Sequence, residues 1–350
     1  MSVEDFVRAM PKVALHVQLE GALDKRRLLQ IAEQNEIADE LKRFDAWVAL
    51  LENPDYERLL DLMNTISQWL RHPDDLTHAV YELGVTLAKQ NVRYAEVHFN
   101  PIRFTENNWT FEQCLDALND GRDRAERGWG VQIRWMLTIG RDQPRHADEI
   151  VRWASSATGR HRGIVGMSLG DPEGAQPVGQ FDRALHTAAK KEIAFIVHAG
   201  LKQGSDGVAQ ALEQLEAPLL FDGWGVVDSP DVSHTLAEKR IPLIVDMKRA
   251  ICHRLVGSYR EYPLRALIDS GITVSLSASM PSLYQTTLNQ EYLAAIQDCG
   301  LSIEKLEQVA LNTVEACQLP ADEKRVLAEQ FVADFAALRS EHLAQPTTSE

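Results

Sequence analysis

The sequence predicts an α/β fold: a TIM (β/α)8 barrel with a helical insertion after the first strand and additional C-terminal helices. Eight short apolar segments alternate with stretches long enough to form crossover helices, which is typical of parallel strands. The expected strands cover residues 12–19, 94–99, 133–139, 163–169, 194–199, 219–225, 241–247 and 273–279. An open doubly wound sheet is the alternative, but no G-x-G-x-x-G motif follows the first strand. Eight units therefore favour a closed barrel.

Helical periodicity dominates the segment after the first expected strand and the segment after the last one. Residues 24–90 alternate charged residues with Leu, Ile, Trp and Met at spacings of three and four, so we expect a helical excursion there. Residues 301–343 show helical character again, and the polar residues 345–350 form an expected disordered tail. A chain of 350 residues with 45% hydrophobic content can bury a full core. We expect one domain over residues 1–344.

Composition narrows the classes of partner and the compartment. The net charge of −15 disfavours a nucleic acid, because phosphate contacts require clustered Lys and Arg. No apolar run approaches the roughly 20 residues of a membrane span, and a cytoplasmic protein without a membrane partner is expected. The four cysteines are far apart and form no CxxC motif, which predicts neither a disulfide framework nor a thiolate zinc site.

Polar residues at the expected strand ends are the candidates for a functional site, because barrel sites form at the carboxyl ends of the strands. His16 and Gln18 end the first strand and lie two residues apart, so both side chains point to one side. The remaining candidates are His98, Gly170, His198, Leu201, Trp224, Asp246, Ser279 and Met280. A single histidine in an apolar strand is more often a core residue, but two at the same barrel end favour a shared pocket.

Several segments, in the right order, resemble the adenosine deaminase family of the metal-dependent amidohydrolase superfamily. They include MPKVALHVQLEGAL, YAEVHFNP, VGMSLGDPEG, FIVHAG, SPDVSHTLAEKRIPL and YPLRALIDSGITVSL. The likeness extends from about Val3 to about Leu338. It implies hydrolytic deamination of a purine nucleoside by a zinc-activated water. In that family zinc is held by His-x-His, a third histidine and an aspartate, a glutamate protonates the ring, and another histidine orients the water.

The residues at the matching positions retain little of that chemistry. His16 and His198 keep two ligand positions, but Gln18 replaces the second histidine of the pair. The family's acid falls on Leu201, which cannot carry a proton, and its water-orienting histidine falls on Trp224.

The residues at the ends of the seventh and eighth expected strands also depart from the family pattern. The Asp-Asp-Pro motif falls on Ser279-Met280-Pro281, and Asp246 begins the segment that replaces Cys-Pro-Thr-Ser-Asn. Glu20 keeps an acidic residue where family members commonly contact the sugar. We therefore expect no zinc, or only weak binding, with His16 and His198 as remnant ligand positions.

Two functional hypotheses follow from these replacements. The first is a pseudoenzyme that has lost deaminase catalysis and binds a nucleoside-like small molecule or a protein partner; a homo-oligomer is compatible with it. The alternative is a hydrolase or deaminase acting on a purine nucleoside or related compound through a rebuilt site, in which His16, His198 and either His98 or Asp246 hold a metal or act as acid and base.

Structural roles compete for three of these candidates. Trp224 could pack the barrel mouth instead of stacking on a base. Asp246 could pair with Lys248 at the surface, and His98 could hydrogen-bond to the backbone at the rim.

Overall fold

The computed structural model describes residues 2–37, 44–106 and 108–342 of the chain. One eight-stranded sheet forms the centre, and its strands follow each other in chain order with parallel pairing. The strands are β1 (Lys12–Gln18), β2 (Val92–Phe99), β3 (Gln132–Ile139), β4 (Ile164–Leu169), β5 (Ala194–Ala199), β6 (Leu220–Asp222), β7 (Leu243–Val245) and β8 (Val274–Leu276). This confirms the predicted barrel.

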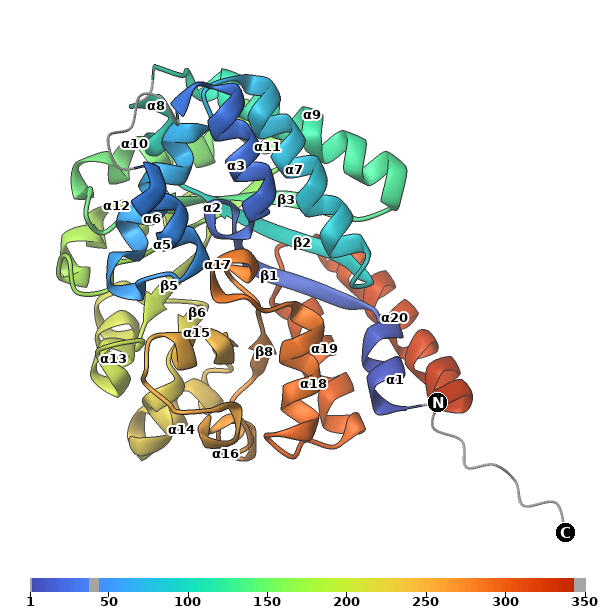
Figure 1. The fold of residues 1–350 in the computed structure, drawn as a ribbon. Coiled ribbons are helices and arrows are strands. Elements are labelled where there is room, and N and C mark those ends of the chain that lie inside the picture. Colours follow the sequence, from blue (N-terminus) through green and yellow to red (C-terminus); the bar gives the residue numbers. More distant parts are fainter. Residues whose placement is uncertain (1, 38–43, 107, 343–350) are drawn as a thin grey trace, which may run out of the picture.

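Helices surround the sheet on its outer face (Figure 1). The α-helices are α1 (Val3–Ala9), α2 (Leu19–Ala22), α3 (Lys25–Gln34), α5 (Phe44–Glu52), α6 (Leu59–Trp69), α7 (Pro73–Ala88), α8 (Pro101–Thr105), α9 (Phe111–Trp129), α10 (Ala147–Ser155), α11 (Ala157–His161), α12 (Asp182–Lys190), α13 (Gly204–Leu215), α14 (Pro230–Glu238), α15 (Met247–Cys252), α16 (Leu264–Asp269), α17 (Pro281–Tyr284), α18 (Leu288–Gln297), α19 (Ile303–Ala316) and α20 (Ala321–His342). Short 3-10 helices are η1 (Tyr56–Arg58), η2 (Pro144–His146), η3 (Val178–Phe181), η4 (Trp224–Asp228) and η5 (Tyr259–Glu261).

The helical insertion is confirmed, and its apolar spacing explains how it packs. In α6 the buried side chains include Leu59, Leu62, Met63 and Ile66, at spacings of three and four. That stripe places one face of α6 on the core and leaves Asp61 exposed. The insertion thereby reaches over the carboxyl ends of the strands, because Leu59 and Met63 also line the cavity described below.

The last strands are shorter than the sequence predicted. Strand β6 ends at Asp222, because Gly223 takes a left-handed conformation with φ +67° and η4 follows. Strand β7 ends at Val245, and Asp246 caps α15 by accepting the backbone N–H of Arg249 at 2.8 Å. Asp246 and Trp224 therefore lie just after their strands.

Hydrogen bonds between β1 and the residues that follow β8 close the barrel. The N–H of Gln18 donates to the carbonyl of Ser279 at 2.7 Å, and the Ser277 hydroxyl donates to the carbonyl of Leu15 at 2.7 Å. Strand β1 changes register between Ala14 and Val17, and His16 between them has φ +63°. A left-handed histidine is a strained conformation, and it directs this side chain into the barrel interior.

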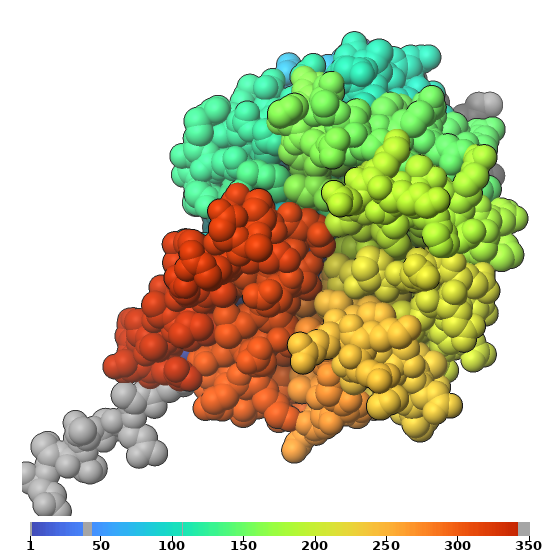
Figure 2. All heavy atoms as spheres, turned by 180° about the vertical axis from the view of Figure 1, so that it is seen from behind, coloured from blue at the N-terminus to red at the C-terminus, as the bar shows by residue number. Residues whose placement is uncertain are grey.

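The C-terminal segment covers the opposite end of the barrel. Figure 2 shows α19 and α20, in red, packed on the side of the molecule between the green and yellow segments. The N–H of Gln318, which lies between these two helices, donates to the buried carboxylate of Glu96 on β2. The expected tail at 345–350 lies outside the described residues, and the single-domain assignment over 1–344 stays a prediction. No described helix is long and apolar enough to cross a membrane.

Candidate functional site

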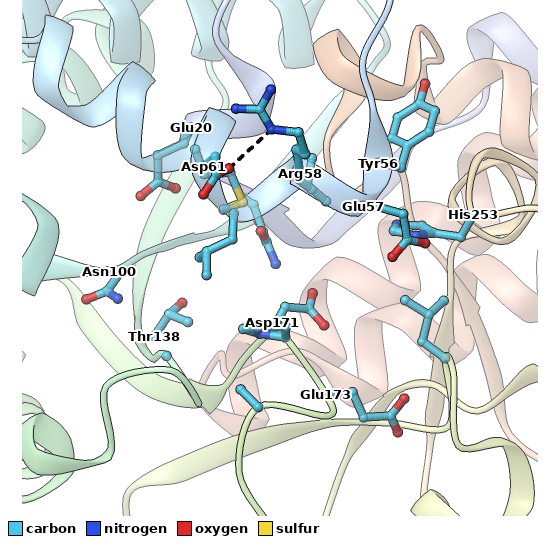
Figure 3. A pocket seen from close by; sticks show the side chains of 18 of the residues that line it. Glu20, Tyr56, Glu57, Arg58, Asp61, Asn100, Thr138, Asp171, Glu173 and His253 are labelled. Carbon is cyan, nitrogen blue, oxygen red and sulfur yellow. Dashed lines mark hydrogen bonds and ion pairs between the residues drawn. The ribbon is translucent and has the colours of Figure 1, made fainter. Parts of the chain in front are cut away.

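A cavity of about 370 Å³ opens at the carboxyl ends of the strands, a volume in the usual range for a small-molecule site. In Figure 3, Glu20 and Asn100 lie on one side of it, Tyr56 and His253 on the other, and Asp171 near its base. The lining residues are Gln18, Glu20, Tyr56, Glu57, Arg58, Leu59, Leu60, Asp61, Met63, His98, Asn100, Arg103, Thr138, Gly140, Asp171, Pro172, Glu173, Gly174, Ala175, Leu201, Lys202, Arg249 and His253. Both the strand ends and the helical insertion therefore build its wall.

Four of the eleven predicted pocket residues line this cavity, and seven do not. The four are Gln18, Glu20, His98 and Leu201. The others are His16, Gly170, His198, Trp224, Asp246, Ser279 and Met280, and all except Trp224 are buried. The prediction thus pointed to the barrel end where this cavity opens. Several of the predicted side chains lie in packed regions of that end and not at the cavity wall.

Three imidazoles lie together in the buried part of the site. The ring of His16 lies 4.1 Å from that of His98 and 4.3 Å from that of His198, measured between centroids. Burial lowers the pKa of each of these imidazoles, that of His16 and His98 well below its ordinary value. For His198 the Asp171 carboxylate acts in the opposite direction, but burial outweighs it and the pKa stays below its ordinary value. The three rings are therefore neutral near pH 7. The Gln18 amide nitrogen lies 3.3 Å from His16 Nε2, which accepts its N–H.

Among the three rings, His98 is the one that reaches the cavity. Its Nδ1 lies 3.1 Å from Ser168 Oγ, which in turn lies 3.1 Å from Thr138 Oγ1. This chain fixes the ring, while Nε2 has no hydrogen-bond partner among the described residues. The predicted alternative of a backbone hydrogen bond at the rim is wrong, because a hydroxyl takes that role. His98 is therefore a fixed, neutral imidazole that lines the cavity, with one buried and unpaired ring nitrogen.

A buried guanidinium holds the carboxylates of the site together. Arg249 Nη2 lies 2.7 Å from Asp171 Oδ2, and Arg249 Nε lies 3.0 Å from Asp222 Oδ1. Arg249 also donates to the Tyr284 hydroxyl at 2.8 Å. His198 Nδ1 lies 3.2 Å from the same Oδ2 of Asp171, so one carboxylate oxygen serves both groups.

Charge pairing decides how these groups ionise. Burial alone would lower the pKa of Arg249, but Asp171 and Asp222 outweigh it and hold that pKa well above its ordinary value. Burial alone would raise the pKa of Asp171, but Arg249 and His198 outweigh it and hold that pKa below its ordinary value. Burial raises the pKa of Asp222, because a single guanidinium does not compensate two carboxylates in a dry interior.

Several replaced positions have structural roles. Ser279 donates its hydroxyl to Asp246 Oδ2 at 2.6 Å, and both residues are buried. The expected surface pair between Asp246 and Lys248 is therefore wrong, because Asp246 faces inward as a helix cap. Met280 packs so closely on Gly21 that a Cβ there would lie 2.4 Å from Met280 Cγ.

Trp224 packs beside the site and not within its wall. Its indole N–H donates to the carbonyl of Leu201 at 3.4 Å, and the side chain is half-buried. Trp224 does not line the cavity, so its position fits the packing alternative better than stacking on a bound base.

Sequence reasoning missed Arg249, Asp171 and Arg103. Asp171 stands in the quoted segment VGMSLGDPEG, directly after β4, and could have been found as a further polar strand end. Arg249 lies on α15, and its partners come from distant strand ends, so no local spacing marks it. Arg103, on α8, pairs with Glu20 at 3.2 Å across the cavity wall.

The donor set does not suit the zinc ion that the resemblance implies. Gln18 and Ser279 offer neutral oxygen or nitrogen atoms, and the hydroxyl of Ser279 is already engaged. A buried cation, Arg249, occupies the Asp171 carboxylate, which lies beside His198. Within residues 2–37, 44–106 and 108–342, no three His, Cys, Asp or Glu side chains are arranged to hold a metal ion. The residues present therefore do not fit zinc.

Comparison with known sequences decides the family. The family model described as adenosine deaminase matches residues 11–334. The chain belongs to the adenosine deaminase family. It is 30% identical over 327 residues to aminodeoxyfutalosine deaminase of Streptomyces coelicolor, covering 93% of this chain and 84% of that relative. It is 27% identical over 332 residues to adenosine deaminase of Enterococcus faecalis, covering 94% of this chain and 98% of that relative.

Solved structures show the same fold. An amidohydrolase of Burkhoderia ambifaria with bound zinc has a TM-score of 0.89 at 23% identity, covering 97% of this chain and 95% of that one. An adenine deaminase of Arthrobacter aurescens has a TM-score of 0.84 at 22% identity, covering 93% of this chain and 99% of that one. At these identities the likeness supports the barrel and carries no statement about substrate.

The pseudoenzyme hypothesis is contradicted by these comparisons. Relatives that match more than nine-tenths of this chain include two aminodeoxyfutalosine deaminases at 30% identity and an adenosine deaminase at 27% identity. The replacements at Gln18, Leu201, Trp224 and Ser279 therefore do not establish a loss of function. The alternative, a rebuilt hydrolytic site, agrees better with the family membership and with the His98 geometry.

Proposed function

We propose that this chain is a hydrolase that deaminates a purine nucleoside or a related purine compound through a rebuilt site. The observation that carries the proposal is His98: a fixed, neutral imidazole that lines a nucleoside-sized cavity at the carboxyl end of a deaminase-family barrel, and whose Nε2 has no partner among the described residues. A neutral imidazole is a competent general base. Relatives named aminodeoxyfutalosine, adenine and adenosine deaminases support a purine-type substrate.

The reaction balances with this chain's own groups. His98 Nε2 takes one proton from a water whose oxygen bonds to the ring carbon that carries the amino group. The carbon–nitrogen bond then breaks as the imidazolium returns that proton to the leaving group, which departs as ammonia. The second water proton stays on the new oxygen as ammonia leaves, and it then passes through solvent water to the adjacent ring nitrogen, which gives the carbonyl form of the product. Ser168 and Thr138 keep the His98 ring oriented throughout.

Polar groups around the cavity suit an uncharged substrate. The amides of Gln18 and Asn100 can hydrogen-bond to a heterocycle, and Glu20 is held by Arg103 beside them. Each cation along the wall is paired with a carboxylate: Arg58 with Asp61 at 3.3 Å, Arg103 with Glu20 at 3.2 Å, Lys202 with Glu57 at 2.8 Å and Arg249 with Asp171 at 2.7 Å. A nucleoside or free base therefore fits the charge pattern better than a nucleotide.

Ammonia release tests the proposal. The purified protein, made in a host without its own purine deaminases, is assayed with adenosine, adenine and aminodeoxyfutalosine. We expect turnover of at least one of them, and a loss of about 100-fold or more in kcat for His98→Asn. His234→Asn, which changes an exposed histidine on α14, is the matched control and should keep full activity. Absence of turnover on all three compounds, or an active His98→Asn variant, would overturn the proposal.

Three expectations from the sequence stay predictions. They are the cytoplasmic location, the small-molecule ligand, and a protein partner or homo-oligomer.

A further inference from the structure

Arg249 is the most completely enclosed cation of the site, with a side chain only 1% exposed. Its partners come from three different parts of the barrel end: Asp171 after β4, Asp222 at the end of β6, and Tyr284 on α17. A guanidinium carries five N–H groups, and three hydrogen bonds to other side chains of the described residues are present here. Arg249 also lines the cavity, so donors remain for a bound molecule.

The position of this cation links it to the remnant ligand residues. Asp171 Oδ2 receives both Arg249 Nη2 and His198 Nδ1, at 2.7 Å and 3.2 Å. On the other side, the Arg249 guanidinium carbon lies 5.4 Å from the centroid of the Phe221 ring, and Phe221 stacks on His16 at 3.9 Å. The guanidinium therefore contacts one neighbour of His198 and one neighbour of His16, the two remnant ligand positions.

We propose that Arg249 is the site's own fixed cation: its guanidinium supplies the positive charge that a metal ion supplies in the family, and it keeps divalent cations out of the site. Two features distinguish Arg249 from a surface ion pair and suit it to replace the charge of a metal ion. The guanidinium engages the carboxylates that would otherwise attract a metal, and it adds positive charge beside neutral imidazoles.

The remaining N–H groups of Arg249 determine which ligand atoms it can bind. A planar guanidinium donates to electronegative atoms, so it suits the carbonyl oxygen or ring nitrogen of a heterocycle at the cavity base. Unlike a zinc ion, it cannot lower the pKa of a bound water to about 7. Activation of water thus rests on His98. This inference concerns the same cavity as the proposed deamination, but its first readout is metal content and does not depend on turnover.

Zinc titration of charge-matched variants tests the role of Arg249. Wild-type protein is dialysed against a chelator, returned to zinc-containing buffer, and its bound zinc and thermal unfolding midpoint are measured. We expect far less than one zinc per chain and no zinc-dependent rise in the midpoint. Arg249→Gln removes the charge while keeping amide donors, and we expect its zinc affinity to rise by about tenfold or more. Arg249→Lys keeps the charge and should remain as free of zinc as wild type.

The outcomes separate this role from a purely structural one. A merely structural arginine would leave the Gln and Lys variants equally indifferent to zinc, and that result would overturn the proposal. Stoichiometric zinc in the wild type would also overturn it, and this measurement stands even if Arg249→Gln does not fold. If the metal results hold but no substrate is turned over, the proposed reaction fails while the internal cation remains supported.

Discussion

At the scale of single residues, positions that depart from the family pattern have structural roles of their own. Ser279 falls where the family resemblance places an aspartate ligand, but its hydroxyl and backbone N–H both donate to Asp246 Oδ2, at 2.6 Å and 2.7 Å. Burial raises the pKa of Asp246, and these two hydrogen bonds act in the opposite direction. Restoring the family residue here would place a second carboxylate against the first.

We therefore expect Ser279→Asp to destabilise the protein and not to rebuild a metal site. An uncompensated buried charge costs about 3 kcal/mol or more in the free energy of unfolding. Urea unfolding monitored by circular dichroism gives this quantity. Ser279→Asn is similar in size and carries no charge, so it should cost clearly less. Equal stability of the Asp variant and the wild type would show that the Asp246 environment accommodates a second charge.

At the scale of elements, the sequence predicted more of the scaffold than of the site. Eight apolar segments were enough to give the barrel, because fully buried parallel strands have continuous apolar sequences. Strands β6 and β7 proved shorter, since the left-handed Gly223 and the cap Asp246 end them, and such termini depend on single residues. The ion pairs of Arg249 join α15 to the loop after β4 and to the end of β6, and no spacing along the chain encodes a contact between three such segments.

The C-terminal segment makes a pH-dependent contact with the far end of the barrel. Glu96 on β2 is buried and accepts hydrogen bonds from the Tyr94 hydroxyl and the Gln318 N–H. Burial raises its pKa from 4.5 to about 7. Between these two pH values the folded protein keeps the proton that the unfolded chain has lost, so the folded state is increasingly disfavoured as pH rises through this window.

Comparing Glu96→Gln with wild type isolates this effect. Relative to Glu96→Gln, the wild type should lose about 1.4 kcal/mol in its free energy of unfolding per pH unit between pH 4.5 and 7. Urea unfolding at several pH values measures the difference, and other titrating groups cancel because both proteins contain them. A constant difference across the window would show that Glu96 ionises normally in the folded state.

At the scale of the whole molecule, both the net charge of the chain and the charges around the cavity disfavour anionic ligands. The chain carries a net charge of −15, and the cavity cations Arg58, Arg103, Lys202 and Arg249 are each paired with a carboxylate. Glu173, which also lines the cavity, accepts the backbone N–H groups of Gly200, Lys202 and Gln203. The long-range field and the local wall therefore agree in sign.

This agreement predicts that the affinities for a nucleoside and for its phosphate ester depend differently on salt. Adenosine carries no charge, so its dissociation constant should change little between low and physiological ionic strength. Isothermal titration calorimetry in the His98→Asn background measures this constant for adenosine and for AMP without turnover. AMP should bind more weakly at low salt and recover part of the difference as salt rises, because the Debye length shrinks from about 30 Å at 0.01 M to about 8 Å at 0.15 M. Lys202→Ala leaves Glu57 without its partner and should weaken AMP binding further, whereas Lys239→Ala, which changes a residue after α14 away from the cavity, serves as the control. Tighter binding of AMP than of adenosine at low salt would mean that the paired cations of the wall release their carboxylates to a phosphate, and the charge argument would fail.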